Sequence, residues 1–328
     1  PKRRYSGGEE ILEHSQAIAR KYGLYDLAVF QTTVTSTVWN SDEKMWHVRT
    51  DRDDLMRARF VVCANGTLSK PKLAKIEGID EFSGHSFHTS RWDYDYTGKD
   101  LENLSDKRVG IIGTGATAVQ AIPELGKRAK ELFIFQRTPS SIDIRDDWET
   151  DPEWASQRPK GWQAARREKS LKAVEPSESQ LAEFATISRE EKIRRQENAN
   201  IDYMMRIHRR IEQEVKDPEV AESLKPWYMF MCKRPCFHNE YLPTFNRSNV
   251  HLVDTRGEGI NQITSKGPVF KDHQYEVDLL IYATGFEVQK TGIYNQILGE
   301  GGLDLQDKYR KGMRTVFGIH SKGYPNLF

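Results

Sequence analysis

The sequence predicts an α/β fold built around parallel β-strands, and three observations support this prediction. First, the apolar run Arg108–Ile112 leads into a glycine-rich turn and then into a helix-like stretch, Ala116–Lys130. Second, another apolar strand, Leu132–Gln136, follows that helix, and a strand–helix–strand order is typical of parallel sheets. Third, two further apolar runs, Phe60–Ala64 and Asp278–Ala283, are each followed by a glycine turn, so we expect buried strands there.

Length and composition indicate an ordinary globular chain of about two domains. Its 328 residues are 37% hydrophobic, which is enough for sizeable cores, and its formal net charge is only +1. A charge this small gives no argument for a nucleic acid or an anionic membrane as partner, and no apolar run is long enough to span a bilayer. The three cysteines make no disulfide framework and lack C-x-x-C spacing, so we expect a reducing, cytoplasmic setting.

The glycine-rich turn after the first strand fits the pattern G-x-G-x-x-A. Gly113 permits the tight turn, Gly115 lets a pyrophosphate approach the backbone, and Ala118 allows the helix to pack closely on the strand. The phosphates would lie at the helix N-terminus, where free N–H groups and the helix dipole favour an anion. A turn without a ligand is the alternative, but the strand before it and the helix after it favour dinucleotide binding. The predicted contacts are Gly113, Thr114, Gly115, Ala116, Thr117, Ala118, Val119 and Gln120.

The residues that follow the second strand predict which dinucleotide binds. An NAD site has Asp or Glu there, roughly twenty residues past the glycine turn, to bind the ribose hydroxyls. This chain has Arg137 and Thr138 instead, a guanidinium and a hydroxyl that suit a 2′-phosphate. The sequence therefore favours NADP(H), and a solvated arginine at a strand end is the alternative.

The N-terminal part predicts a capped helix and a β-hairpin. Ser6, with Glu9 three residues later, forms a capping box for a helix over Gly7–Tyr22 that presents an apolar side. Phe30–Trp39 and Trp46–Thr50 then alternate around a polar turn, as the two strands of a hairpin do. The apolar helix positions are Ile11, Ile18 and Tyr22.

Between residues 143 and 226 the composition changes to charged residues, tryptophans and helix formers, interrupted by prolines. We predict several helices in this segment. The clearest carries an apolar stripe at three- and four-residue spacing, which predicts a buried helix face. His208 on this stripe has no second ligand four residues further on, so we expect a core or rim histidine and no metal site. The stripe consists of Ile201, Met204, His208, Ile211 and Val215.

The loop that precedes the glycine turn carries a specific signature. It fits F-x-G-x-x-x-H-x-x-x-W-D, with Phe82, Gly84, His88, Trp92 and Asp93 at the fixed positions. Because this loop lies directly ahead of a nucleotide-binding turn, the sequence resembles the type I Baeyer–Villiger monooxygenases. These flavoenzymes include the phenylacetone, cyclohexanone, steroid and polycyclic-ketone monooxygenases, and the resemblance covers the whole chain. We expect the signature residues to couple domain movement rather than to touch the substrate.

A second segment carries the resemblance and implies the catalytic residue. Lys233-Arg234-Pro-Cys-Phe, with Tyr-Leu-Pro-Thr-Phe-Asn-Arg shortly after it, is similar to the family segment in which the lysine contacts the 2′-phosphate and the arginine stands by the flavin. The resemblance thus implies that Lys233 assists Arg137 and that Arg234 is the catalytic cation. Two solvated basic residues are the alternative. The remaining implied positions are Val34 as a cofactor contact, and Gly66 and Gly285 where the chain crosses between domains.

The resemblance implies an enzyme that uses FAD and NADPH to convert a ketone into an ester or lactone with O2, through a flavin peroxide. Its fold would contain two Rossmann-like nucleotide-binding domains, with the FAD domain incomplete and a helical insertion in the NADP domain. The expected divisions are 1–81 for part of the FAD domain, 82–142 and 228–285 for the NADP domain, 143–227 for the insertion, and 286–328 for the return to the FAD domain.

A second glycine motif, which a flavin site would need, is missing from the sequence. No other strand is followed by G-x-G-x-x-G, so we expect a chain that lacks the first part of its FAD domain and is inactive alone. Two alternatives stay open. A flavin-dependent N- or S-oxygenating monooxygenase has the same two-nucleotide plan, although Trp92 and Asp93 argue against it. A non-enzymatic NADP-binding module is the reading if the chain is complete as given.

Overall fold

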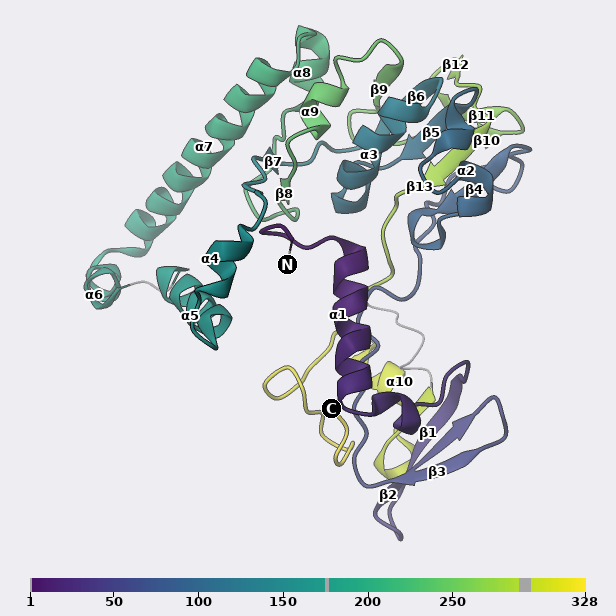
Figure 1. Cartoon of the computed structure of the whole chain (residues 1–328), viewed down its shortest axis with the longest axis vertical. Coiled ribbons are helices and arrows are strands. Elements are labelled where there is room, and N and C mark those ends of the chain that lie inside the picture. Colours follow the sequence, from purple (N-terminus) through teal and green to yellow (C-terminus); the bar gives the residue numbers. More distant parts are fainter. Residues whose placement is uncertain (1, 175–176, 289–295) are drawn as a thin grey trace. The chain divides into compact units, whose positions relative to one another are not determined.

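A computed structural model describes residues 2–174, 177–288 and 296–328 (Figure 1). The chain divides into two compact units. Unit 1 comprises Pro1–Ser15 and Lys75–Ala283, and unit 2 comprises Gln16–Ala74 and Thr284–Phe328. The first fifteen residues, which we expected to belong with the flavin part, therefore group with unit 1.

Unit 1 is built on a five-stranded sheet in which all neighbouring strands are parallel. Its strand order is β4-β13-β5-β6-β9. Because the strands run in one direction, their carboxyl ends meet at one edge, where ligands bind in open α/β sheets. The prediction of an α/β fold with a parallel sheet is confirmed. The strands are β4 (His85–His88), β5 (Arg108–Ile112), β6 (Glu131–Gln136), β9 (Val250–Asp254) and β13 (Leu279–Tyr282).

Both faces of this sheet are buried, which explains the continuous apolar runs in the sequence. Ile111 and Ile134 belong to the main core, whereas Ile112 and Phe135 belong to a second core on the opposite face. Successive residues of a strand point to opposite faces, so each run supplies both cores. The helix α3 (Ala116–Arg128) packs into the main core through Ala118, Val119, Ile122 and Leu125. The second core includes residues of a three-stranded sheet, β10 (Gln262–Thr264), β11 (Gly267–Phe270) and β12 (His273–Gln274).

The predicted helices lie between two short strands, β7 (Ile142–Asp143) and β8 (Cys236–Phe237), which pair in parallel. The longest of them, α7, begins after Ser188, whose side chain accepts a hydrogen bond from the Glu191 N–H. In the described residues these helices are α4 (Pro152–Ser156), α5 (Trp162–Val174), α6 (Glu178–Thr186), α7 (Arg189–Glu214) and α8 (Pro218–Leu224).

The apolar stripe predicted on α7 is only partly correct. Ile201 is 55% exposed, so its place in the buried face is wrong. His208 is half-buried and its Nε2 lies 2.8 Å from the Pro226 carbonyl oxygen, consistent with a rim histidine. The burial is confined to the C-terminal half of the helix, because only that half packs into the main core. The buried residues there are Met204, Ile207, Arg210 and Ile211, with Val215 just beyond the helix end.

Unit 2 contains a four-stranded sheet with the order β14-β1-β2-β3. β1 (Val34–Asn40) and β2 (Met45–Thr50) form the predicted antiparallel hairpin, although the first strand begins at Val34 rather than at Phe30. Trp46 is fully buried at the centre of this unit, and its indole N–H donates to the Pro325 carbonyl at 2.7 Å. The other strands are β3 (Leu55–Ala58) and β14 (Ile297–Leu298), and the helix is α10 (Leu305–Tyr309).

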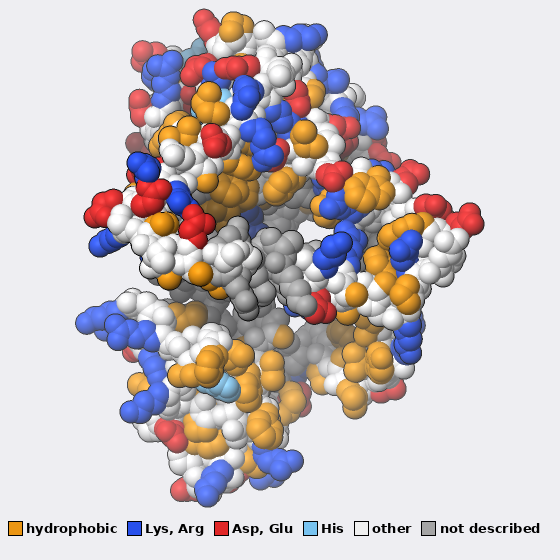
Figure 2. Space-filling model, turned by 90° about the vertical axis from the view of Figure 1, so that its left-hand side faces the viewer, with side chains coloured by type: hydrophobic (Ala, Val, Ile, Leu, Met, Phe, Trp, Pro, Cys, Tyr) orange, Lys and Arg blue, Asp and Glu red, His pale blue; other side chains and the backbone are white. Residues whose placement is uncertain are grey.

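The predicted N-terminal helix is α1 (Gly8–Lys21), and none of its residues is buried. Its apolar positions Ile11 and Ile18 are 56% and 40% exposed. Leu27, Phe60 and Phe317 are further large apolar side chains with exposed surface. Figure 2 shows such side chains, in orange, gathered at several places on the face it presents. The short remaining elements are α2 (Tyr94–Thr97), α9 (Tyr241–Thr244) and the 3-10 helices Leu24–Leu27, Thr89–Arg91, Glu102–Leu104 and Glu300–Gly302.

The prediction of a buried strand over Phe60–Ala64 is wrong. Phe60 and Val62 are 59% and 70% exposed, and the pairing found for this run is an isolated bridge between Val61 and Leu327. An apolar run becomes a buried strand only when neighbours pair with it and layers cover both faces. Among the described residues, the backbone hydrogen bonds of Phe60–Ala64 are formed with residues 326–328 alone.

The signature run Phe82–Asp93, predicted as a loop, contains the strand β4. Its sequence His85-Ser-Phe-His88 has little apolar character and gives no strand signal by itself. Pairing with β13 over all four residues decides its conformation, and β4 is an edge strand of the parallel sheet.

Candidate functional site

The glycine turn lies at the carboxyl edge of the sheet, between β5 and α3. Gly113 has φ +109°, which L side chains rarely adopt, and a Cβ added there would lie 2.6 Å from the Ala283 carbonyl oxygen. Its N–H donates to the Phe135 carbonyl at 3.0 Å. Gly113 is therefore required by the close approach of β13. Gly115 differs, because its φ is −79° and the space beside its Cα is open.

The first turn of α3 offers backbone groups rather than charged side chains. Gly115, Ala116, Thr117 and Gln120 are exposed, whereas Thr114 is 4% exposed. Ala118 and Val119 are buried, so any contact they make with a ligand is through the backbone or the rim of a cavity. An exposed helix N-terminus of this kind binds anions through its free N–H groups.

Hydrogen bonds tie this turn to the chain that follows β6. The Thr114 hydroxyl donates to the Thr138 carbonyl at 2.9 Å, and the Ser140 hydroxyl donates to the Thr114 carbonyl. No pattern in the sequence singles out Ser140. These bonds fix the glycine turn and the Arg137–Thr138 pair as one structure.

The structure brings Lys233 next to the predicted 2′-phosphate residues. Its ammonium donates to the Thr138 carbonyl at 3.0 Å and lies 3.4 Å from that of Pro139. Burial lowers the pKa of Lys233, and the positive charge of Arg137 lowers that pKa further. A half-buried ammonium that is destabilised by a nearby positive charge is stabilised when an anion binds next to it. Among the described residues, no acidic side chain forms an ion pair with Arg137, Lys233 or Arg234.

Tyr228 joins this cluster and was not predicted. Its hydroxyl donates to the Pro139 carbonyl at 3.0 Å and accepts from the Ser141 N–H at 3.1 Å. Its ring centroid lies 5.5 Å from the Lys233 ammonium. Burial raises the pKa of Tyr228 to about 12, so the phenol stays neutral and keeps both bonds.

A cavity of about 500 Å³ adjoins the first turn of α3 on one side. Arg234 is exposed, and the next residue in the chain, Pro235, already lines this cavity. The Arg145 guanidinium lies over the Tyr5 ring, 5.3 Å from its centroid, at the same cavity. Neither Tyr5 nor Arg145 was predicted, because no local pattern marks them. The lining residues are Tyr5, Ala116, Val119, Gln120, Ile144, Arg145, Asp146, Pro235, Cys236 and Phe237.

The signature residues make local hydrogen bonds and ring contacts around β4. Trp92 donates its indole N–H to the Thr97 hydroxyl at 3.1 Å. Asp93 caps α2 and bonds to His85 at 2.9 Å, and His85 stacks on Tyr96 with centroids 4.0 Å apart. The backbone bonds of this cap are the largest influence that lowers the pKa of Asp93.

The other signature residues also make local contacts. A Cβ on Gly84 would lie 2.8 Å from the Asp278 carbonyl oxygen, and Phe82 packs against the second core. His88 is 6% exposed, with Nδ1 2.8 Å from the Ser90 hydroxyl. Trp92 and Thr117 both line a second cavity, of about 460 Å³, so the signature loop and α3 contribute to the same cavity.

Three of the predicted residues, Val34, Gly66 and Gly285, belong to unit 2, whereas the glycine turn belongs to unit 1. Gly285 has φ +80°, and its carbonyl accepts from the Lys72 N–H at 2.9 Å. Gly66 has φ +66°. Gly285 lies two residues after Ala283, where unit 1 ends, and Gly66 lies eight residues before Ala74, where the first part of unit 2 ends.

The described residues hold no group of three or more His, Cys, Asp or Glu side chains suited to a metal ion. Among them there is also no helix with the length and apolar character needed to cross a membrane.

The known proteins that this sequence resembles are flavin-binding and Baeyer–Villiger monooxygenases and similar enzymes. Residues 4–152 match a family described as flavin-binding monooxygenase-like. The whole chain is 45% identical to "Baeyer-Villiger monooxygenase ATR8" of Stachybotrys chlorohalonatus and covers 57% of it. It is 43% identical to "Neopentalenolactone D synthase" of Streptomyces avermitilis and covers 60% of that protein.

Solved structures that resemble this chain include further monooxygenases. The polycyclic ketone monooxygenase of Thermothelomyces thermophila matches all of this chain with a TM-score of 0.85 and 37% identity, over 60% of its own length. A structure of OTEMO in complex with FAD and NADP matches with a TM-score of 0.83 and 30% identity, over 66% of its length. The chain thus spans between about half and two thirds of the relatives it matches. The predicted resemblance is confirmed, and the chain is a relative of the flavin-binding Baeyer–Villiger monooxygenases over all of its 328 residues.

Proposed function

We propose that the protein containing this chain is an FAD- and NADPH-dependent Baeyer–Villiger monooxygenase that converts a ketone into an ester or lactone with O2. The observation that carries the proposal is the convergence of Arg137 and Lys233 beside an exposed glycine turn, with Arg234 next in the chain. Relatives named Baeyer–Villiger monooxygenases support the reaction class. The coenzymes supply the redox chemistry, and the chain's residues bind, orient and neutralise charge.

The residues of unit 1 fit NADP(H). Gly113 makes the turn, the open space at Gly115 accommodates a pyrophosphate, and the exposed N-terminus of α3 supplies N–H donors. Arg137 and Lys233 then hold the 2′-phosphate, and the 500 Å³ cavity beyond Ala116 is where we propose that the nicotinamide half lies. This orientation would direct the reacting end of the coenzyme towards Arg234.

The described residues do not form a pyrophosphate site for FAD. Unit 2 has a sheet with antiparallel pairs, β1 with β2 and β2 with β3, and its described residues contain no strand, glycine turn and helix in series. We propose FAD as a cofactor from the relatives, among them OTEMO with FAD and NADP bound.

We propose the domain roles that the resemblance implies. Residues 82–142 and 228–285 form the NADP domain, 143–227 is a helical insertion in it, and 1–81 with 286–328 belong to the FAD domain. The division of the described chain near residues 74 and 283 supports these boundaries, with residues 1–15 as the exception. Phe82, Gly84, His88, Trp92 and Asp93 would couple movement of the two domains.

Turnover of a cyclic ketone tests the proposed function. The protein that contains this chain is incubated with FAD, NADPH and a panel of cyclic ketones under isotopically labelled O2. We expect ketone-dependent NADPH oxidation and a lactone that carries one labelled oxygen atom. Oxygenation of amines or sulfides alone, without any lactone, would assign the protein to the N- or S-oxygenating class instead.

Arg137→Ala is expected to weaken NADP+ binding by at least tenfold and to leave NAD+ binding nearly unchanged. A charge-assisted bond to the 2′-phosphate is worth about 1.5–3 kcal/mol, and NAD+ has no such phosphate. Fluorescence or calorimetric titration with both coenzymes measures the difference. Equal losses for the two coenzymes would exclude Arg137 from the 2′-phosphate site.

A further inference from the structure

One face of α7 is directed at the segment that carries Lys233 and Arg234. Residues spaced by three or four positions along a helix share a face. Four residues at such spacing, Asn200, Tyr203, Arg206 and Arg210, each contact either this segment or the neighbouring strand β7.

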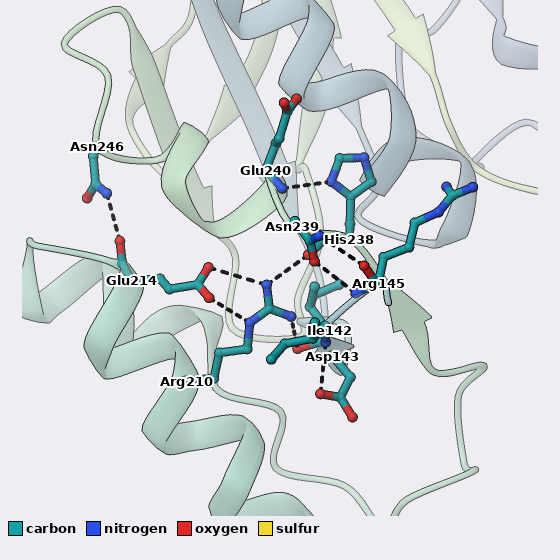
Figure 3. A network of polar contacts seen from close by, with 10 residues as sticks. Ile142, Asp143, Arg145, Arg210, Glu214, His238, Asn239, Glu240 and Asn246 are labelled. Carbon is teal, nitrogen blue, oxygen red and sulfur yellow. Dashed lines mark hydrogen bonds and ion pairs between the residues drawn. The ribbon is translucent and has the colours of Figure 1, made fainter. Parts of the chain in front are cut away.

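Arg210 forms hydrogen bonds with Glu214 and with the backbone carbonyls of Ile142 and His238 (Figure 3). Its side chain is 9% exposed, and Nε donates to Glu214 Oε1 at 2.8 Å. Its Nη1 donates to the Ile142 carbonyl at 3.3 Å, and its Nη2 donates to the His238 carbonyl at 2.9 Å and to Glu214 Oε2 at 3.3 Å. One guanidinium thus bridges β7 and the end of β8 while Glu214 neutralises its charge.

This bridge reinforces a ladder that is otherwise very short. β7 and β8 contain two residues each, and the flanking bonds join the Cys236 N–H to the Ser141 carbonyl at 2.9 Å and the His238 N–H to the Asp143 carbonyl at 3.0 Å. A pair this short is marginal without other support. Arg206 adds an ion pair to Asp143 at 2.6 Å on the same side.

The other end of the segment is held by the same helix. The Asn200 side-chain oxygen accepts from the Phe230 N–H at 2.6 Å, and the Tyr203 and Phe230 rings lie 3.9 Å apart. Asn200 and Arg210 are ten positions apart, or about 15 Å along a helix. α7 therefore fixes both ends of residues 230–238, and Lys233 and Arg234 lie between the two anchors.

We propose that Arg210, neutralised by Glu214, is a positioning residue that holds the Lys233–Arg234 segment in coenzyme-binding geometry. A buried charge adds little stability by comparison with apolar packing, but a fork of fixed geometry sets the register of the backbone it binds. For Lys233 this inference rests on the proposed NADP(H) site. The anchoring of the segment itself is independent of the coenzyme.

Two measurements on Arg210→Met test the proposal. The first is amide hydrogen exchange of the peptide spanning 230–238, without coenzyme, which we expect to be about tenfold faster than in the unmodified protein. The second is titration with NADP+ and NAD+. The affinity for NADP+ should fall about tenfold and that for NAD+ should not change, because a tenfold loss corresponds to one displaced charge-assisted bond. Arg209→Met is the matched control, because Arg209 is exposed and its Nε donates to the Met205 carbonyl within α7.

Each result of these two measurements either supports or contradicts the proposed role of Arg210. Faster exchange together with selective loss of NADP+ binding supports the proposal. Unchanged exchange overturns it, even if Arg210→Met lowers the melting temperature. Faster exchange with equal effects on both coenzymes overturns the role towards Lys233 if Arg137→Ala remains selective for NADP+. If Arg137→Ala is unselective as well, the proposed coenzyme site has failed and the exchange result alone decides whether Arg210 anchors the segment. If Arg210→Met does not fold, Arg210→Lys undergoes the same two measurements, because lysine keeps the charge but cannot form the fork.

Discussion

Replacing Arg234 by alanine should lower the rate of ester formation by about 10²–10³, equivalent to about 2.7–4 kcal/mol of transition-state stabilisation. Binding of NADP+ should be retained, because the 2′-phosphate is assigned to Arg137 and Lys233. The variant would therefore separate coenzyme binding from the oxygenation step.

The expected size follows from the position and chemistry of Arg234. Arg234 is exposed, the next residue Pro235 lines the 500 Å³ cavity, and among the described residues Arg234 has no acidic ion-pair partner. Its charge is therefore available to a ligand, and a guanidinium cannot lose its proton at working pH. Negative charge that develops on oxygen during attack on the ketone would be stabilised by such a fixed cation.

Measurement of the kcat for ester formation and of the Kd for NADP+ in the same preparation checks this prediction. Arg209→Ala serves as the control, since that arginine is exposed, bonds to the Met205 carbonyl of its own helix and does not line the cavity. Normal ketone turnover by the Arg234→Ala protein would remove this residue from the mechanism.

Gly113→Ala should destabilise unit 1 and abolish coenzyme binding. The φ of +109° is unfavourable for alanine, and the new Cβ would lie 2.6 Å from the Ala283 carbonyl oxygen. Backbone strain and overpacking each cost about 1–3 kcal/mol. Denaturant unfolding and NADP+ titration measure the two effects.

Gly115→Ala is the matched comparison, two residues away in the same turn. Its φ of −79° suits alanine and its Cβ would meet no other atom, so the free energy of unfolding should change by less than about 1 kcal/mol. We nevertheless expect weaker NADP+ binding, because a methyl group would occupy the space of the pyrophosphate. Unaltered affinity in a stable Gly115→Ala protein would mean that the phosphates lie elsewhere.

Local sequence was sufficient for the elements of the coenzyme site. β5, β6 and β13 are apolar runs buried on both faces, and the glycine turn follows β5 directly. Their conformation depends on neighbouring residues and on the apolar period, which a sequence displays. The approach of Lys233 to Thr138 was expected only from the family resemblance, since 95 positions separate the two residues.

Tertiary contacts decided the structure of the elements for which the prediction from sequence was wrong. Phe60–Ala64 is more apolar than β4, yet β4 is the strand, because β13 pairs with it along four residues. On α7, Ile201 fitted the apolar period but lies where the helix does not contact the core, whereas the charged Arg210 is buried.

By itself, the sequence determined the parallel sheet and the glycine turn, because each depends on residue types at short spacing, and from Arg137 and Thr138 it predicted a 2′-phosphate ligand. Only the tertiary structure decided how the Lys233–Arg234 segment is held. Its anchors are Asn200 and Arg210, which reach backbone groups of Phe230 and His238 about 30 residues further along the chain. A backbone carbonyl has the same chemistry at every position, so no pattern in the sequence indicates which one a distant arginine will bind.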